Sequence, residues 1–255
     1  FNLNDLKALG LPGDNSLIVN DMEAAVNCLV AYKKGIKELE VENIYANSEK
    51  TELHFNNSIL IIPGTGVGVA AVMMPTAEDK QLQHMYVSCE VQHTVMSELN
   101  NQYSGLVELM KIQLNKDLLS WEDFVSGKGL ENIYTCLCNK NSRDTSKQKE
   151  LAAARIAELA VTGTDETCIR ALEYYYEICA YLTQVMALAF QPFAGIYLAG
   201  ETTRKNQSFI INSQFVNKLQ DNSKRQELLR AFPVFLVPEY MNLDGAMYIA
   251  QRNFS

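Results

Sequence analysis

Basic charge is scarce in this chain. Its 22 Lys and Arg residues stand against 30 Asp and Glu residues, which gives a formal net charge of -8. A nucleic-acid-binding protein ordinarily needs a basic face to displace counterions from phosphates. The short basic clusters within residues 33–37 and 140–149 are more typical of a solvated surface. We therefore expect no nucleic-acid partner.

Cysteine pairs of the metal-binding kind are also missing. Six cysteines occur, and the closest two, Cys136 and Cys138, are separated by a single residue. That spacing excludes a zinc knuckle and a thioredoxin motif at this place. Cys28, Cys168 and Cys179 have apolar neighbours in helix-like stretches, which indicates reduced thiols in a core and a cytoplasmic protein.

One uncharged run is long enough to span a membrane, but its residues argue against a span. Residues 178–200 contain no charged side chain. They do contain Gln184 and Gln191, and Pro192 should end a helix near Gln191. We expect a buried helix, a break and a buried strand at 195–199, and no membrane partner.

The remaining pattern is that of a globular α/β protein. Apolar residues make up 47% of the 255 residues, enough to bury a core without disulfides. Apolar runs predict strands at 17–19, 58–62, 69–74, 85–88, 196–199 and 234–237. Helical spacing predicts helices at 4–9, 22–34, 106–119, 130–138, 149–159, 165–191, 209–219, 224–231 and 243–252, with Thr164 capping the longest. Residues 44–57 are polar and turn-rich, and the strands around residues 63–68 form a hairpin, so we expect a mixed sheet.

Two segments at predicted strand ends could carry phosphate-transfer chemistry. The glycine segment Gly64-Thr65-Gly66-Val67-Gly68 lets backbone N–H groups approach an anion. It lacks the ending of a P-loop and no helix follows it, so a plain hairpin turn is the alternative. Asn20-Asp21 follows the first predicted strand, where Asp21 is either a general base toward a hydroxyl or an N-cap.

Two further segments offer hydroxyl-binding groups. Glu90 and His93 lie within four residues directly after a predicted strand and could bind a polyol. Metal binding is the rival interpretation, without a third ligand at useful spacing, and ordinary surface polarity is another. Glu122, just before the glycines at 127 and 129, is either a further hydroxyl acceptor or a solvated helix end.

Taken together, these segments resemble the bacterial-type glucokinase family, a branch of the actin-like sugar kinases. The resemblance covers essentially the whole chain, and its most specific part is the loop Pro63-Gly-Thr-Gly-Val-Gly-Val-Ala70. The other similar segments, in order, are 17–25, 90–93, 120–134, 195–200 and 242–246.

The resemblance implies a fold, a reaction and a role for each motif residue. The fold is the actin-like, ribonuclease H-like sugar kinase fold with a mixed sheet, and the reaction is ATP-dependent phosphorylation of glucose to glucose 6-phosphate, the first step of glycolysis. Asp21 is the general base for the 6-hydroxyl. The implied sugar-binding residues are Asn20, Glu90, His93 and Glu122, and the implied nucleotide-binding residues are Gly64, Thr65, Gly66 and Gly200. The cofactors are ATP and Mg²⁺, and the family often forms homodimers.

Several positions depart from the family pattern. Cys89, Val91 and Gln92 stand where the family has glycines around its sugar-binding Glu. Glu201 replaces a glycine and puts an anion near the nucleotide. These departures favour two alternatives, a catalytically weakened sugar-binding homologue with a regulatory role, or a kinase for another hexose. The related repressor and kinase branch has a zinc-binding cysteine cluster that this chain lacks.

The family's N-terminal Asp-x-Gly-Gly-Thr phosphate loop has no counterpart in the sequence. The chain therefore resembles the family without about its first hundred residues. We expect residues 1–34 to be a remnant of a small N-terminal domain, with the C-terminal helix 242–255 packed against it. Residues 35–241 would form the large domain. Such a chain alone is expected to be incomplete for catalysis.

Overall fold

The computed structural model describes residues 10, 16–46, 56–73, 85–96, 101–141, 151–237 and 239–254. Within these ranges a six-stranded sheet has the order β1-β6-β5-β2-β3-β4. The strands are β1 (Glu42–Tyr45), β2 (Ser58–Pro63), β3 (Val67–Met73), β4 (Met85–Cys89), β5 (Ile196–Ala199) and β6 (Val234–Val237). Strands β2, β5 and β6 run parallel, whereas β1, β3 and β4 pair antiparallel with their neighbours. The expected mixed sheet and the hairpin β2–β3 are therefore confirmed.

The sheet is buried on both faces because its strands alternate between two hydrophobic clusters. In β2, Ile59 and Ile61 join one cluster while Leu60 joins the other, as the two-residue period of a strand requires. In β5, Leu198 and Tyr197 divide in the same way. Both faces must therefore be covered by helices.

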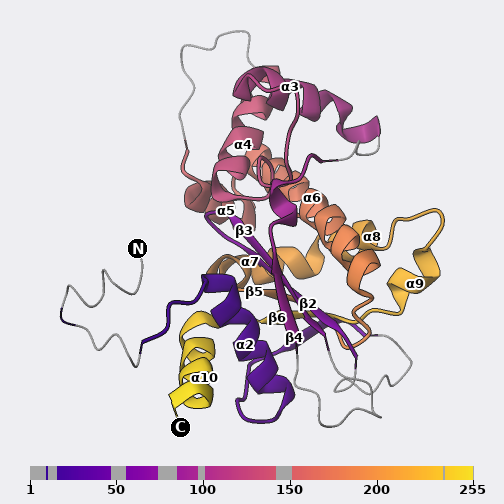
Figure 1. The fold of residues 1–255 in the computed structure, drawn as a ribbon. Helices are drawn as coiled ribbons and strands as arrows, with labels where there is room; N and C mark the ends of the chain where they lie inside the picture. The colour runs from indigo at the N-terminus through magenta and orange to yellow at the C-terminus, as the bar shows by residue number, and fades with distance from the viewer. Residues whose placement is uncertain are drawn as a thin grey trace.

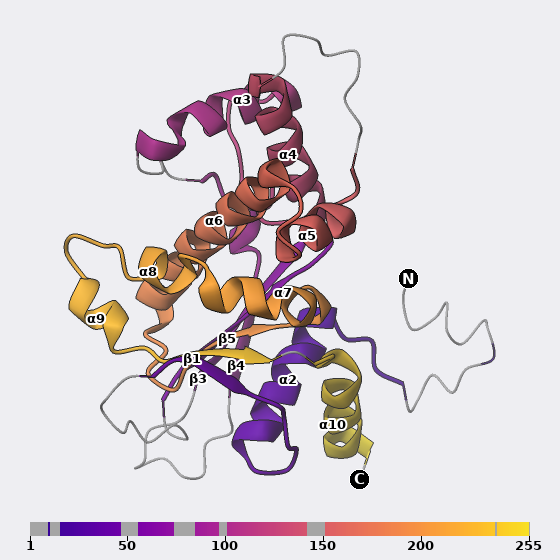
Figure 2. The same cartoon turned by 180° about the vertical axis from the view of Figure 1, so that it is seen from behind.

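Two helices cover one face, and some of the other helices cover the opposite face. Helices α2 (Asp21–Lys33) and α10 (Asn242–Phe254) lie side by side in Figures 1 and 2, and α2 packs on β3 and β4. The opposite face carries the long α6 (Glu166–Phe190), which connects the sheet to α3, α4 and α5 at the far end of the molecule (Figure 1). The remaining helices are η2 (Val91–His93), η3 (Asn101–Tyr103), α3 (Ser104–Leu114), α4 (Gly127–Asn141), α5 (Ala153–Val161), α7 (Glu201–Asn212), α8 (Phe215–Leu219) and α9 (Gln226–Arg230).

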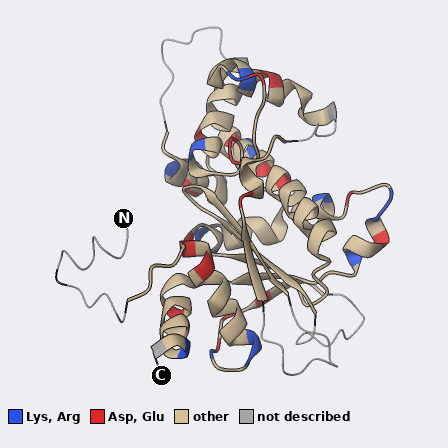
Figure 3. Ribbon diagram, viewed as in Figure 1, with Lys and Arg blue, Asp and Glu red and all other residues tan. Residues whose placement is uncertain are grey.

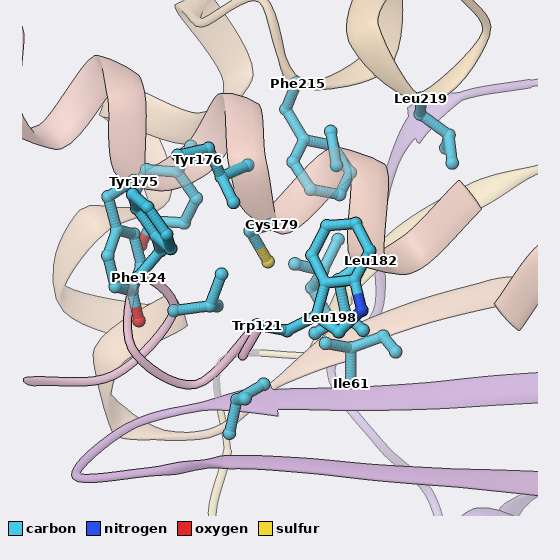
Figure 4. Packing of buried hydrophobic residues seen from close by; sticks show 14 of the residues in the cluster. Ile61, Trp121, Phe124, Tyr175, Tyr176, Cys179, Leu182, Leu198, Phe215 and Leu219 are labelled. Atoms are coloured by element: carbon cyan, nitrogen blue, oxygen red, sulfur yellow. The ribbon is translucent and has the colours of Figure 1, made fainter. Parts of the chain in front are cut away.

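The core beneath α6 is rich in aromatic side chains. Figure 4 shows Trp121, Phe124, Tyr175 and Tyr176 packed between this helix and the sheet, with Cys179 among them. The thiol of Cys179 is free, and burial raises its pKa to about 12. Cys28 and Cys168 are likewise free and buried, so the expected core thiols are confirmed.

Helix α6 is most deeply buried in its middle, at residues 175–183, and ends where the sequence predicted. Its last residue is Phe190, Gln191 adopts a left-handed conformation with φ 46°, and Pro192 follows. Its N-cap is Asp165, whose Oδ1 accepts from the Cys168 backbone N–H at 2.8 Å, so the assignment of the cap to Thr164 is wrong. Among the helices of the described ranges, none is long and apolar enough to cross a bilayer.

Other predictions need correction. Residues 17–19 form no strand, and Leu17 and Ile18 are about half exposed, because a three-residue apolar run has no neighbouring strand to pair with in the described ranges. The helix predicted at 106–119 ends at Leu114, where Asn115 turns left-handed. The helix predicted at 130–138 begins earlier, at Gly127, and that predicted at 209–219 is two helices, α7 and α8. Part of the turn-rich stretch 44–57 belongs to β1, while the helix expected at 4–9 lies outside the described residues.

Candidate active site

A cleft of about 650 Å³ lies at one end of the sheet, where several segments distant in sequence meet. It is lined by the N-terminus of α2, the β2–β3 loop, the end of β4, the start of α7 and the segment before α10. The cleft brings together most of the residues implicated by sequence: Asn20, Asp21, Gly64, Thr65, Gly66, Glu90, Glu122 and Gly200. His93 does not line the cleft, but its ring nitrogens lie close to the carboxylates of Glu90 and Glu122.

Asp21 stands at the start of α2 with its carboxylate exposed to the cleft. The N-cap of α2 is Asn20, whose Oδ1 accepts from the Met22 backbone N–H at 2.8 Å, and Asp21 is the first helical residue. The helix dipole stabilises negative charge at this position. Asn242 of α10 donates from Nδ2 to the Asp21 carbonyl oxygen at 3.0 Å, which fixes the backbone there. The acidic start of α2 is visible in Figure 3.

Glu90 and Glu122 are joined through one imidazole. His93 Nε2 lies 3.3 Å from Glu90 Oε2, and His93 Nδ1 lies 3.1 Å from Glu122 Oε2. The short 3₁₀ turn η2 makes this possible because it brings His93 back toward Glu90. Both carboxylates border the cleft. In each one, His93 lies against Oε2, and the other oxygen, Oε1, can accept a hydrogen bond from a hydroxyl group.

The β2–β3 loop is held from two sides. Gly127 at the start of α4 donates from its backbone N–H to the carbonyl oxygens of Gly64 at 2.8 Å and Thr65 at 3.2 Å. On the other side, a Cβ added at Gly66 would lie only 2.5 Å from Glu122 Oε1, so only glycine lets that carboxylate approach the loop. The loop is thus more than a plain hairpin turn, since it contacts the start of a helix and a site carboxylate.

A second pocket of about 560 Å³ opens on the other side of this loop. It shares Gly64, Thr65, Glu201 and Thr202 with the cleft. Its apolar wall is formed by Leu130, Ala153, Ala157, Leu172 and Tyr175, and its polar rim includes Lys128, Lys205 and Asn206. An apolar slot with a few placed polar groups suits a flat ring with a charged substituent.

Sequence reasoning found only the edge of that second pocket, through Gly64 and Thr65 of the glycine loop. Its wall comes from α5, whose small side chains Ala153, Ala154 and Ala157 leave room between the helices. The alanine-rich composition of residues 152–157 was the available signal. On its own, that composition predicts a helix and not a pocket wall.

Glu201 does not stand as an isolated anion beside this pocket. Arg204 Nε donates to Glu201 Oε2 at 2.7 Å, and Lys205 Nζ lies 3.3 Å from Glu201 Oε1. Hydrogen bonds from Arg204, and then from Lys205, lower the pKa of Glu201 to about 2. The carboxylate is therefore ionised at neutral pH, but two cations on the next turn of α7 offset its charge.

No group of three or more His, Cys, Asp or Glu side chains within the described ranges is arranged to hold a metal ion. Glu90, His93 and Glu122 contact one another in pairs and do not surround a common point.

The sequence profile of the family described as Glucokinase matches residues 6–253. The chain belongs to the glucokinase family. Its curated relatives include the glucokinase of Nitrobacter hamburgensis, 28% identical over 240 residues that cover 94% of this chain and 69% of that protein. The glucokinase of Colwellia psychrerythraea is 28% identical over 74% of this chain and 56% of that protein. The chain thus spans between half and about two thirds of the length of the relatives it matches.

Solved glucokinase structures share the fold. A glucokinase from an Antarctic psychrotroph superposes with a TM-score of 0.74 at 24% identity, covering 92% of this chain and 68% of that one. The glucokinase of Balamuthia mandrillaris, solved in complex with glucose, gives a TM-score of 0.85 at 19% identity, covering 98% of this chain and 70% of that one. The predicted family and its sugar kinase fold are confirmed.

The packing of α10 on α2 is observed, with Gly245 against the Ala24 carbonyl. The division into a small domain of residues 1–34 with 242–255 and a large domain of residues 35–241 remains a prediction.

Proposed function

We propose that this glucokinase-family protein transfers the terminal phosphoryl group of ATP to the 6-hydroxyl of glucose, yielding glucose 6-phosphate and ADP, the entry step of glycolysis. The observation that carries the proposal is the shared glycine loop, which has a carboxylate-lined cleft on one side and a slot for a ring on the other. A phosphoryl donor and a polyol bound in these neighbouring pockets would meet at the shared residues Gly64 and Thr65.

In the proposed reaction, Asp21 accepts the proton of the sugar 6-hydroxyl as its oxygen bonds to the terminal phosphorus. The bond between that phosphorus and the bridging oxygen of ATP breaks, and ADP leaves with the electron pair. Phosphoryl transfer depends mainly on positioning and on electrostatic stabilisation, so one well-placed base is sufficient proton chemistry.

The other hydroxyls would be held by Asn20, Glu90, His93 and Glu122. His93 lies within 3.3 Å of both glutamates and limits the motion of the carboxylate to which it donates before the sugar arrives, which reduces the ordering cost of binding. A sugar epimer that leaves one of these acceptors unpaired loses about 1–3 kcal/mol per group. The carboxylate pair therefore supplies selectivity among hexoses.

The nucleotide would lie across the loop. Gly64, Thr65 and Gly66 would face the phosphates, and Gly200, which lines the cleft just before α7, would lie near the adenosine. Lys128 and Lys205 line the second pocket, where each also pairs with a glutamate, Glu131 and Glu201 respectively. When bound with ATP, Mg²⁺ would neutralise negative charge on the phosphates. The cytoplasmic location and the homodimer remain predictions.

A regulatory sugar-binding homologue is the second candidate function. The replacement of family glycines by Val91, Gln92 and Glu201 favours it. Such a protein would bind glucose without phosphorylating it. A kinase for another hexose would bind and phosphorylate a different sugar at the same cleft.

The test combines glucose-binding calorimetry with a coupled assay of glucose 6-phosphate formation. Asp21→Asn should retain glucose binding and reduce kcat at least about a hundredfold, because the general base is lost. Glu90→Gln should weaken glucose binding, whereas Glu108→Gln, at an exposed position of α3, serves as the control. Glucose binding without turnover in the unaltered protein would favour the regulatory candidate. A hexose panel in which another sugar wins would overturn glucose as the substrate.

A further inference from the structure

Gln92 is a buried polar residue at the wall of the sugar cleft. Only 6% of its surface is exposed, although it lies in the middle of the short turn η2. Its Nε2 donates to Glu90 Oε2 at 2.6 Å. Its backbone carbonyl accepts from the Glu122 backbone N–H at 3.0 Å. One residue therefore contacts both segments that carry the cleft glutamates.

The other half of the Gln92 amide has no partner. Its Oε1 is buried without a hydrogen bond to any residue in the part of the chain that the structure describes. The amide cannot be turned around to relieve this, because Oε1 would then face the Glu90 carboxylate, an acceptor against an acceptor. An orphaned buried acceptor destabilises the folded state. An apolar side chain of the same size would avoid that cost.

We propose that Gln92 is a positioning residue of the sugar site, whose side-chain amide fixes the Glu90 carboxylate and whose backbone carbonyl fixes the turn before α4 that carries Glu122. The inference rests on the proposed function of the cleft. The polar side chain is kept at a cost to stability, which is the pattern expected of a residue that serves a site.

The position of Glu90 explains why such a clamp is needed. Its side chain is largely exposed, and of the described residues only His93 and Gln92 hold its carboxylate. An exposed glutamate otherwise samples many rotamers, and the side-chain entropy lost when the sugar binds weakens affinity. A donor at 2.6 Å from a buried neighbour limits that freedom before the sugar binds.

The first experiment is Gln92→Met, which keeps the volume of the side chain and removes both amide groups. Sugar affinity and stability should then move in opposite directions. The KM and the dissociation constant for glucose should rise about tenfold, as expected for a lost hydrogen bond to a carboxylate. The value of kcat should change little, because the base is untouched. The urea midpoint should stay the same or increase.

Gln220→Met is the matched control. Gln220 is also buried with an orphaned amide atom, its Nε2, but it follows α8 and does not line the cleft. This variant should likewise keep or gain stability while leaving the glucose KM unchanged. Gln92→Glu should raise the glucose KM more than Gln92→Met, because it places a second carboxylate against Glu90.

A double-mutant cycle then tests whether Gln92 acts through Glu90. In a Glu90→Ala background, Gln92→Met should cause no further loss of glucose affinity. Additive losses, an unchanged glucose KM in Gln92→Met, or a fall in stability that parallels the loss of affinity would overturn the role of Gln92. An unaltered protein that neither binds nor phosphorylates a hexose would overturn the proposed function along with it.

Discussion

The contact between α2 and α10 predicts opposite effects for two glycine substitutions of the same type. In Gly245→Ala, the new Cβ would lie 1.7 Å from the Ala24 carbonyl oxygen, half the 3.4 Å of an ordinary contact, and 2.9 Å from the Cys28 nitrogen. Both atoms are backbone, so the helices must move apart. Overpacking of this kind costs about 1–3 kcal/mol or more, against a gain of about 1 kcal/mol in helix propensity.

Gly105→Ala is the control, because Gly105 lies in α3 with nothing within 4 Å of the added Cβ. It should stabilise the protein by about 0.5–1 kcal/mol. Urea unfolding monitored by circular dichroism would compare the two variants. Since Asn242 at the start of α10 holds the Asp21 carbonyl, Gly245→Ala should also lower kcat. Equal stability changes of the same sign in the two variants would refute the reasoning.

Three other perturbations follow from contacts already described or from single buried groups. Burial lowers the pKa of Lys33 from 10.5 to about 8, so the unfolded state binds more protons between these values and stability should rise with pH across that window. Compared with Lys33→Met, the unaltered protein should gain about 2 kcal/mol in unfolding free energy between pH 7 and 10, and parallel curves would contradict this. Tyr103→Phe removes the donor 2.5 Å from the buried Glu177 Oε2 and should destabilise by about 1–3 kcal/mol in urea titrations; no change would mean that water replaces the donor. Gly66→Ala should displace the Glu122 carboxylate and weaken glucose binding in calorimetry, and unchanged affinity would exclude Glu122 from the sugar site.

Local sequence patterns predicted the parts of the fold that depend on near neighbours. The hairpin β2–β3 was found because β-branched runs flank a glycine loop, and its register needs no distant partner. Helix α6 was found because its apolar spacing and the following Pro192 are both local signals. The failures involve distant partners. Strand β1 is short and partly polar, and it exists because it pairs with β6, far along the chain.

The candidate site shows the same division. The motifs around Asp21, Glu90 and the glycine loop could be identified in sequence, and the structure places them at one cleft. The bridge through His93 and the pairing of Glu201 with Arg204 could not be predicted, because each depends on side-chain direction. The backbone contact of Gly127 to the loop could not be predicted either, because it joins segments distant in sequence. The first two turns of α7 were missed because residues 201–208 are polar, with no apolar period to reveal a helix.

The β2–β3 loop lines both the cleft and the second pocket. The Glu122 carboxylate lies close to Gly66 of this loop on the cleft side. Gly127 at the start of α4, which lines the second pocket, donates hydrogen bonds to the loop carbonyls. A ligand that shifts this loop changes the shape offered to the other ligand, and thermodynamic linkage makes the effect equal in both directions. The affinity for one ligand would then depend on whether the other ligand is bound. The dissociation constant of each ligand, measured alone, should therefore differ from the value measured with the other ligand present.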